Sequence, residues 1–169
     1  MGVIKVPLTR GLFAIVDDAD AALVLPYKWY ACPAPRRVTW YAARKLNGGR
    51  QYMHHVICPP PPGRGVDHID GDGLDNRREN LRPATQKEQT RNRRPQGNKM
   101  SSPYKGVRWH SRKTRYRNGG HWEAAITVDG KRIHRSAHSE LEAARLYNDL
   151  ARQHFGEFAW LNPILEAVA

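Results

Sequence analysis

Residues 1–57 of this chain consist of short apolar runs separated by turn-forming residues. Runs of this length, bounded by Gly, Pro, Asn and Asp, are typical of strands in an antiparallel sheet. Asn47-Gly48-Gly49 is a strong hairpin signal, and the pattern over Asp17–Leu25 favours a short helix. The predicted strands of this segment are Phe13–Val16, Trp29–Ala31, Thr39–Ala42 and Gln51–His54.

A second strand-rich pattern covers residues 103–162 and ends in a helix. Alternation within Trp122–Val128 places the apolar side chains on one face, as in a half-buried strand. Ser139 and Glu142 have the spacing of a helix cap, and Gly156 is placed to end that helix. The predicted strands are Tyr104–Trp109, Trp122–Val128 and Lys131–Arg135, joined by a basic loop at His110–Gly120 and a tight turn at Asp129-Gly130.

A polar stretch between the two patterns indicates two small domains. This stretch is rich in Gly, Ser, Asn and Pro, which is the composition of a linker. The predicted organisation is a first domain at 1–94 with its core motif at 52–94, a linker at 95–103, a second domain at 104–162 and a tail at 163–169.

The motif that says most about chemistry is Asp67-His68, which stands at the expected end of a short strand and before a turn rich in Gly, Asp and Asn. Neighbouring side chains of a strand point to opposite sides, so these two can approach a phosphate from different directions. Taken alone, an acid beside a histidine in such a string is also compatible with an acidic surface turn.

A polar helix is expected after this turn, because Thr85 and Glu88 have the spacing of a capping box. Gln89 and Asn92 lie three residues apart and share one face of that helix. A hard divalent cation needs oxygen ligands, and a water that attacks a phosphodiester needs a base with a pKa near 7. The Asp-His pair and the helix amides can supply both.

Composition points to an anionic partner. The 169 residues include 28 Lys and Arg against 16 Asp and Glu, a formal charge of +12. Nucleic acid is the first candidate, and a ribosomal or membrane-surface role is the alternative. No apolar run approaches the roughly 20 residues of a spanning helix, and the N-terminus lacks the apolar core of a signal peptide. We therefore expect a soluble cytoplasmic protein that is not secreted and binds no membrane.

Cysteine usage bears on metal binding. Cys32 and Cys58 form no C-x-x-C pair, which excludes a four-cysteine structural zinc site. Both are expected to be free thiols, because a disulfide is unfavourable in a reducing cell.

The core motif, YMHHVICPPPPGRGVDHIDGDGLDNRRENLRPATQKEQTRNRR, resembles phage and intron-encoded HNH endonucleases of the homing type. The leader phrases VPLTRGLFAIVDD and YKWYA resemble the same group. The resemblance implies a ββα-metal active site. His68 would be the general base, Asp67 a ligand of the divalent metal, and Asn80 the residue that holds the loop aiming His68. His54 would contact the phosphate, while His55 stands where relatives often have Arg.

The resemblance also implies a second metal ligand on the polar helix. That position falls on Gln89, where relatives usually carry Asn, and Asn92 one turn further is the fallback. The implied ion is Mg²⁺ or Mn²⁺. A single motif of this kind cuts one DNA strand at a time, so we expect nicking by a monomer rather than double-strand cleavage by a dimer.

Residues 103–162 resemble an AP2 DNA-binding domain through the phrases YKGVRW, HWEAAITVDGKR, EAARLYNDLA and FGEFAWLN. The segment Ile133–Ala137 departs from the Leu-Gly-x-Phe phrase usual in AP2 domains, and the basic loop at His110–Gly120 favours phosphate contacts. Residues 91–117 contain ten Lys or Arg and no Asp or Glu, interleaved with aromatic residues. The candidate contacts to double-stranded DNA are Arg91, Arg93, Arg94, Lys105, Arg108, Trp109, Arg112, Lys113, Arg115, Arg117, Trp122, Lys131 and Arg132.

These expectations combine into one prediction. The fold is α+β: an N-terminal antiparallel sheet leads into the ββα-metal HNH motif, followed by an AP2-like domain of a three-stranded antiparallel sheet and one helix. The function is site-directed nicking of DNA in a bacterial or phage-infected cell, with one divalent metal and a His base. Two alternatives stay open: a DNA-binding regulator with a degenerate nuclease motif, because of Gln89, and a basic RNA-associated protein.

Overall fold

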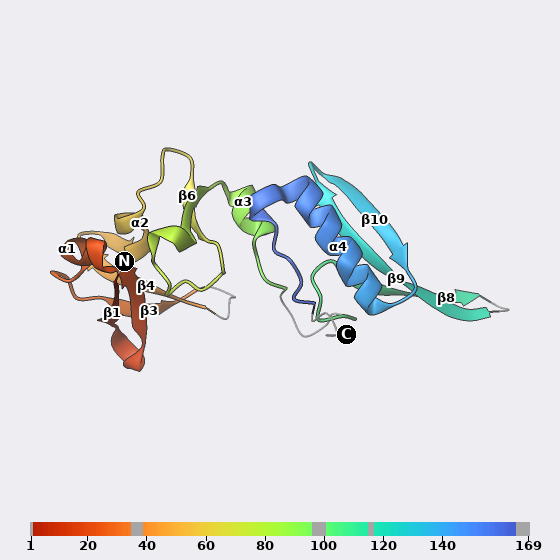
Figure 1. The fold of residues 1–169 in the computed structure, drawn as a ribbon, viewed down its shortest axis with the longest axis horizontal. Coiled ribbons are helices and arrows are strands. Elements are labelled where there is room, and N and C mark those ends of the chain that lie inside the picture. Colours follow the sequence, from red (N-terminus) through yellow and green to blue (C-terminus); the bar gives the residue numbers. More distant parts are fainter. Residues whose placement is uncertain (1, 35–38, 96–100, 115–116, 165–169) are drawn as a thin grey trace. The chain divides into compact units, whose positions relative to one another are not determined.

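The computed structural model describes residues 2–34, 39–95, 101–114 and 117–164, apart from the side chains of 112–118 (Figure 1). The chain forms two compact units, Met1–Thr90 and Arg91–Ala169. Each unit has its own hydrophobic core. Among the described residues, no helix is long and apolar enough to cross a membrane.

Antiparallel pairing organises the described part of the first unit. β1 pairs with β2, β3–β4–β5 form a three-stranded sheet, and β6 pairs with β7. The strands are β1 (Val3–Pro7), β2 (Phe13–Asp17), β3 (Tyr30–Pro33), β4 (Trp40–Leu46), β5 (Gly49–Tyr52), β6 (Gly65–His68) and β7 (Leu81–Ala84). The helices are α1 (Ala21–Val24), α2 (Met53–Ile57) and α3 (Gln86–Arg91), with 3₁₀ turns η1 (Thr9–Gly11), η2 (Asp18–Asp20) and η3 (Arg78–Asn80).

Inward-facing positions of several elements build the core of this unit. Alternation along β2 buries Ala14 and Val16, and β4 contributes Ala42. Met53 and Ile57 are both buried and lie four residues apart, so a helix places them on one face. The core therefore ties α2, which ends the leader segment, to the sheets.

The second unit is a sheet with one helix packed along it. Strands β8 (Val107–Thr114), β9 (Arg117–Val128) and β10 (Lys131–Ala137) are antiparallel in the order β10-β9-β8. Figure 1 shows α4 (Glu140–Phe155), in blue, lying along this sheet, and η4 (Gly156–Phe158) follows it. Ala124 and Ile126 of β9 meet Ala144 and Tyr147 of α4 in the core.

Several sequence-based expectations are confirmed. The fold is mixed α and β with antiparallel sheets. The hairpin signal joins β4 to β5, with Leu46 opposite Gly49. Ser139 caps α4 by accepting a hydrogen bond from the Glu142 amide at 3.1 Å, and Gly156 ends it with a φ of 54°.

Two expected boundaries are wrong. The strand predicted at Gln51–His54 ends at Tyr52, and His54 lies on α2, because the buried pair on that helix imposes a helical rather than an alternating period. The loop predicted at His110–Gly120 is instead a continuation of β8 and β9, which pair as far as Thr114 opposite Arg117. The two strands continue to pair through their backbones in this segment. Its sequence is polar and has no alternating apolar positions, so the pattern did not predict strands there.

Candidate active site

The β6–β7 hairpin carries Asp67 and His68 as the last two residues of β6. In its register Asp67 lies opposite Arg82, and His68 lies opposite Leu81. Adjacent strand residues point to opposite faces, so the carboxylate and the imidazole leave the hairpin on different sides. Both side chains are buried, with residue exposures of 9% and 5%. The site is thus desolvated on both faces of one short strand.

Asn80 closes the loop that follows His68. Its side-chain oxygen accepts a hydrogen bond from the Asp70 amide at 3.0 Å. Its side-chain nitrogen donates to the Asp70 carboxylate and to the Asp75 carbonyl, both at 2.9 Å. The Ile69 amide donates to the backbone carbonyl of Asn80, also at 2.9 Å. One amide side chain therefore ties the two ends of the loop together next to His68.

The β1–β2 hairpin supports the far end of the same loop. The Ile15 amide donates to the Leu74 carbonyl at 2.8 Å, and the Asn76 amide donates to the Ile15 carbonyl at 2.7 Å. Arg78 forms a two-pronged ion pair with the buried Asp20, with a shortest distance of 2.7 Å. These contacts anchor the motif loop to the leader segment.

Strand β4 supports the middle of the loop and brings Tyr41 to the site. The Gly73 amide donates to Thr39 Oγ1 at 3.0 Å. A Cβ atom at Gly73 would lie 2.4 Å from both the Trp40 carbonyl oxygen and the Tyr41 ring, so this approach requires glycine. The sequence pattern places Tyr41 only in a strand and does not reveal its contact with the motif; the one available signal is a glycine inside the acidic turn.

Aromatic rings enclose His68. Its ring centroid lies 5.7 Å from that of Tyr41 and 5.0 Å from that of His54, which meets it edge-on at 88°. Burial lowers the pKa of His68, while a hydrogen bond with Asn76 and the loop carboxylates act in the opposite direction. The imidazole is therefore neutral at pH 7, which is the form that a general base requires.

His54 is buried beside His68 and is also neutral. It stacks on Tyr52 with a centroid distance of 5.2 Å, and its Nδ1 atom is buried with no hydrogen-bond partner among the described residues. Burial, together with the neighbouring His68 and His55, lowers the pKa of His54 to about 2. His55 is exposed. The structure places His54 as a packing partner of His68, and a phosphate contact through it stays a prediction.

Asp67 is held by an arginine that sequence analysis did not single out. Arg82 Nη2 lies 2.9 Å from Asp67 Oδ2, and Arg82 Nε lies 3.1 Å from the same oxygen. The arginine is itself buried, at 8% exposure. The two residues are cross-strand partners, so the register of the hairpin, which sequence does not state, creates this pair.

The helix expected to supply the second metal ligand packs on β6. The Thr85 amide donates to the Glu88 carboxylate at 2.7 Å, which confirms the capping box at the start of α3. Gln89 Nε2 lies 3.5 Å from the Val66 carbonyl oxygen, one residue before Asp67. Asn92 follows the last residue of α3 and is buried in the second unit.

The donors near Asp67 suit a hard divalent cation. Within the described part of the chain, no group of three or more His, Cys, Asp or Glu side chains could hold a metal ion. Mg²⁺ keeps most of its water and commonly uses one or two carboxylates together with substrate phosphates. One carboxylate from Asp67 and one amide oxygen from Gln89 fit that mode, and they do not fit a closed all-protein cage.

A second candidate surface is the sheet face of the second unit that is turned away from α4. The register places Arg108 opposite Glu123 on this face. Glu123 is buried and forms an ion pair with Arg132. It also lies 3.1 Å from His110 Nε2 and 3.2 Å from His134 Nδ1. The face therefore carries a buried acid surrounded by basic side chains.

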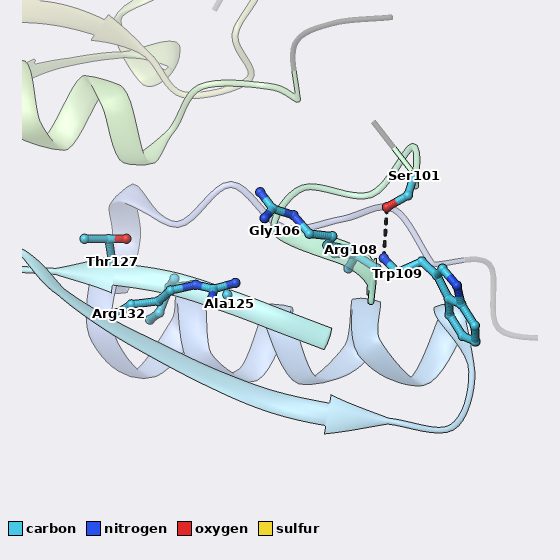
Figure 2. A pocket seen from close by; sticks show the side chains of 9 residues that line it. Ser101, Gly106, Arg108, Trp109, Ala125, Thr127 and Arg132 are labelled. Atoms are coloured by element: carbon cyan, nitrogen blue, oxygen red, sulfur yellow. Dashed lines mark hydrogen bonds between the residues drawn. The ribbon is translucent and has the colours of Figure 1, made fainter. Parts of the chain in front are cut away.

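This face is hollowed over β8 and β9. The hollow has a volume of about 550 Å³, and Arg108 and Arg132 are among its lining residues. Figure 2 shows these side chains, with a dashed line for the hydrogen bond from the Trp109 amide to Ser101 Oγ. That bond is 2.9 Å long. Trp109 and Trp122 are cross-strand partners with centroids 5.3 Å apart, and Trp122 packs against the core. Arg108, Arg132 and the exposed Trp109 line the hollow, and DNA contacts through Trp109 and Trp122 stay predictions.

The remaining candidate DNA contacts have varied surroundings. Arg91 packs over the Phe155 ring at 4.8 Å, and Arg94 over the Trp160 ring at 5.2 Å. Lys105 Nζ donates to the Arg91 carbonyl, and burial lowers the pKa of this lysine to about 8. Arg93 is half-buried, and Lys131 is exposed at the start of β10. The side chains of Arg112, Lys113 and Arg117, and the whole of Arg115, lie outside the described residues.

Comparison with known proteins gives a consistent result. Residues 52–91 match a family described as HNH endonuclease. The chain is 30% identical over 162 residues to an uncharacterized HNH endonuclease of Acanthamoeba polyphaga mimivirus, covering 92% of this chain and 77% of that protein. It is 29% identical over 133 residues to protein 3.8 of Escherichia phage T7, covering 78% and 93% respectively. No solved structure gives a significant match.

Proposed function

This chain belongs to the HNH endonuclease family and is a DNA endonuclease, and from that premise we propose that it nicks duplex DNA at a single site built on His68 and Asp67. The observation that carries this proposal is a buried, neutral imidazole one residue from a buried carboxylate. Asn80 ties down the loop that follows them. General-base catalysis and metal binding then share one short strand.

In the proposed reaction His68 accepts the proton of the attacking water. The water oxygen bonds to phosphorus as the bond to the 3′ oxygen breaks. HNH nucleases generally use a divalent metal, and Asp67 with Gln89 would hold it here, with Mg²⁺ or Mn²⁺ as the ion. When bound, the ion stabilises the charge that develops on the phosphate and on the leaving oxygen. Asn80 acts through the loop, by keeping the backbone next to His68 in place.

One Asp-His pair occurs in the chain. One site hydrolyses one phosphodiester at a time, so a monomer leaves a nick, and a double-strand break requires a second copy or a second encounter. The viral sources of the two relatives support a phage-type, homing-like enzyme that acts on DNA inside the infected cell.

The second unit is proposed to hold the DNA in the manner of an AP2 domain. Its strand order and its single packed helix support this assignment. The exposed Arg108 and Arg132 on the hollowed face support contacts to phosphates or guanine edges. The buried Glu123 holds Arg132 in place on that face.

A plasmid nicking assay tests the proposed chemistry. The full chain is expected to convert supercoiled DNA to open circles with Mg²⁺ or Mn²⁺ and to lose this activity with a chelator. His68→Ala should lower the rate by about 10²–10⁴-fold, because the general base is removed, and should leave DNA affinity nearly unchanged. His138→Ala, at an exposed histidine of the second unit, is the matched control. Undiminished nicking by His68→Ala would contradict the assignment.

A further inference from the structure

We propose that one face of the β3–β4–β5 sheet is a second DNA-binding surface, in which Lys45 and Arg50 bind backbone phosphates that flank the cut. This inference rests on the endonuclease activity of the chain. It does not depend on the role proposed for the second unit or on the metal ligands. The evidence is the register of the sheet, the contacts of Arg50 and the charge of the surface.

The register places both cations on the side of the sheet that leads to His68. Lys45 lies directly opposite Arg50, and Ala43 lies opposite Tyr52. Side chains two residues apart share a face, so Tyr41 of β4 and Tyr52 of β5 belong to the same face as the two cations. Tyr41 contacts the ring of His68, and Tyr52 stacks on His54. The surface is therefore continuous with the aromatic wall of the active site.

Arg50 is held in place by neutral groups. Its Nη1 donates to Cys32 Sγ at 2.9 Å and to the Tyr52 hydroxyl at 3.2 Å. Its guanidinium carbon lies 5.9 Å from the Tyr52 ring centroid. Within the described residues, no carboxylate forms an ion pair with Arg50 or with Lys45. Arg50 thus keeps its full charge, remains exposed and has a restricted position.

An anionic partner explains why two cations stand opposite each other. Like charges in directly opposed strand positions repel, and such pairs destabilise a sheet. A hollow of about 430 Å³ opens between them, lined by Tyr30, Lys45, Leu46, Gly49, Arg50 and Tyr52. Phosphate oxygens in this hollow would relieve the repulsion. The hydroxyl groups of two tyrosines would supply additional polar contacts.

The spacing indicates which phosphates bind. Lys45 lies four residue steps beyond Tyr41 along β4, a path of about 13 Å. Duplex DNA rises by about 3.4 Å per base pair. For a duplex aligned with β4, Lys45 and Arg50 would contact the backbone about four base pairs from the phosphate at His68. They act on binding and placement of the DNA, not on the bond that breaks.

Steady-state nicking by the full chain at several salt concentrations tests this surface. Lys45→Ala should raise KM and leave kcat unchanged, because one phosphate contact is lost. The salt slope, which is the change in log KM per unit change in log salt concentration, should fall by about 0.9 when one phosphate contact is lost. The ratio of the variant's KM to the wild-type KM should therefore shrink about 3–4-fold between about 50 and 200 mM salt. Lys5→Ala, at an exposed lysine of β1, is the matched control and should change neither quantity.

Arg50 is tested by a pair of variants. Arg50→Lys should largely retain KM, because charge is kept, and Arg50→Gln should raise it. If Arg50→Gln fails to fold, Lys45→Ala decides the question, since its side chain makes no hydrogen bond or ion pair within the described residues. A Lys45→Ala enzyme with the KM and salt slope of the Lys5→Ala control would overturn the inference. The endonuclease assignment would then stand or fall separately, on His68→Ala.

Discussion

At the residue scale, His54 and His68 show how one side-chain type can have two different electrostatic environments. Both imidazoles are buried and their rings are in contact. His68 has Asn76 and three loop carboxylates that favour its protonated form, and these partly offset burial. Burial and the neighbouring His68 and His55 all lower the pKa of His54, and no described group is found to raise it. The charges around His68 thus favour its protonated form, whereas those around His54 oppose it.

The buried His54 predicts a specific dependence of stability on pH. Its pKa is about 2 in the folded state and near 6.5 when unfolded, so the unfolded state binds more protons as pH falls below 6.5. The stability that the neutral ring contributes is present above the unfolded pKa and is lost progressively below it. Between about pH 7.5 and pH 5 the wild type should lose about 2 kcal/mol relative to His54→Phe. Urea unfolding of both proteins at the two pH values measures this, and parallel losses would show that His54 titrates normally.

Gln89 and Asn92 allow a second test at this scale. Gln89→Ala should raise the metal concentration needed for half-maximal nicking, and Asn92→Ala should do less. The reason is that Gln89 packs beside Val66, next to Asp67, and Mg²⁺–oxygen bonds are only about 2.1 Å. Gln89→Asn is expected to restore the shorter side chain of relatives and lower the requirement. The reverse order of the two alanine variants would move the ligand role to Asn92.

At the element scale, the candidate active site is a β-hairpin and a helix supported by the leader sheets. β6 and β7 supply the Asp67–Arg82 pair, and the capping box starts α3 directly after β7. The loop between the strands is held by backbone hydrogen bonds to β2 and by Thr39, the residue before β4. The motif therefore depends on residues that precede it by a large sequence distance.

Gly73→Ala tests this dependence. The added methyl group would meet a carbonyl oxygen and a ring of β4, and backbone cannot yield as a flexible side chain can. The variant should be destabilised by about 1–3 kcal/mol and should nick more slowly, since the loop that aims His68 must shift. DNA affinity should change little. Gly49→Ala, where no atom lies within 4 Å of the new methyl group, is the control for unfolding free energy. Equal stability of the two variants would contradict the close packing of β4 and the loop.

At the scale of the whole molecule, the chain forms two compact units, and the proposal assigns cutting of DNA to the first and holding of DNA to the second. The first unit ends at Thr90, and the basic segment from Arg91 onward belongs to the second. Arg91 and Arg94 pack on Phe155 and Trp160, which explains why the division precedes the linker expected at residues 95–103. The positive charge of the segment is thus attached to the β8–β9–β10 unit.

A fragment of residues 91–169 should therefore bind duplex DNA by itself and supply most of the affinity. Binding should weaken steeply with salt, because each phosphate contact releases counterions. Gel shifts of this fragment, of residues 1–90 and of the full chain give the comparison. Tight binding by residues 1–90 alone, equal to that of the full chain, would contradict the division.

Local signals in the sequence were sufficient for most elements. The capping pairs Thr85–Glu88 and Ser139–Glu142, and the glycine that ends α4, each act within a few residues, so their outcome depends on little else. The Asp67-His68 pair likewise has its two groups in adjacent positions, and the resemblance of the whole core motif at 52–94 was needed to predict an endonuclease. The assignment of the pair to β6, before the loop closed by Asn80, follows from short-range patterns.

Only the tertiary structure decided what surrounds those residues. The pairing of Arg82 with Asp67, the contact of Tyr41 with His68 and the alignment of Lys45 with Arg50 all depend on strand register. A shift of one residue would turn each side chain to the opposite face, and nothing in the local pattern sets that shift. The burial of Asp67 and His68 also depends on the tertiary structure, because the residues that cover them come from strands far apart in sequence. The sequence by itself therefore determined which groups are available, and packing determined their charge state and their partners.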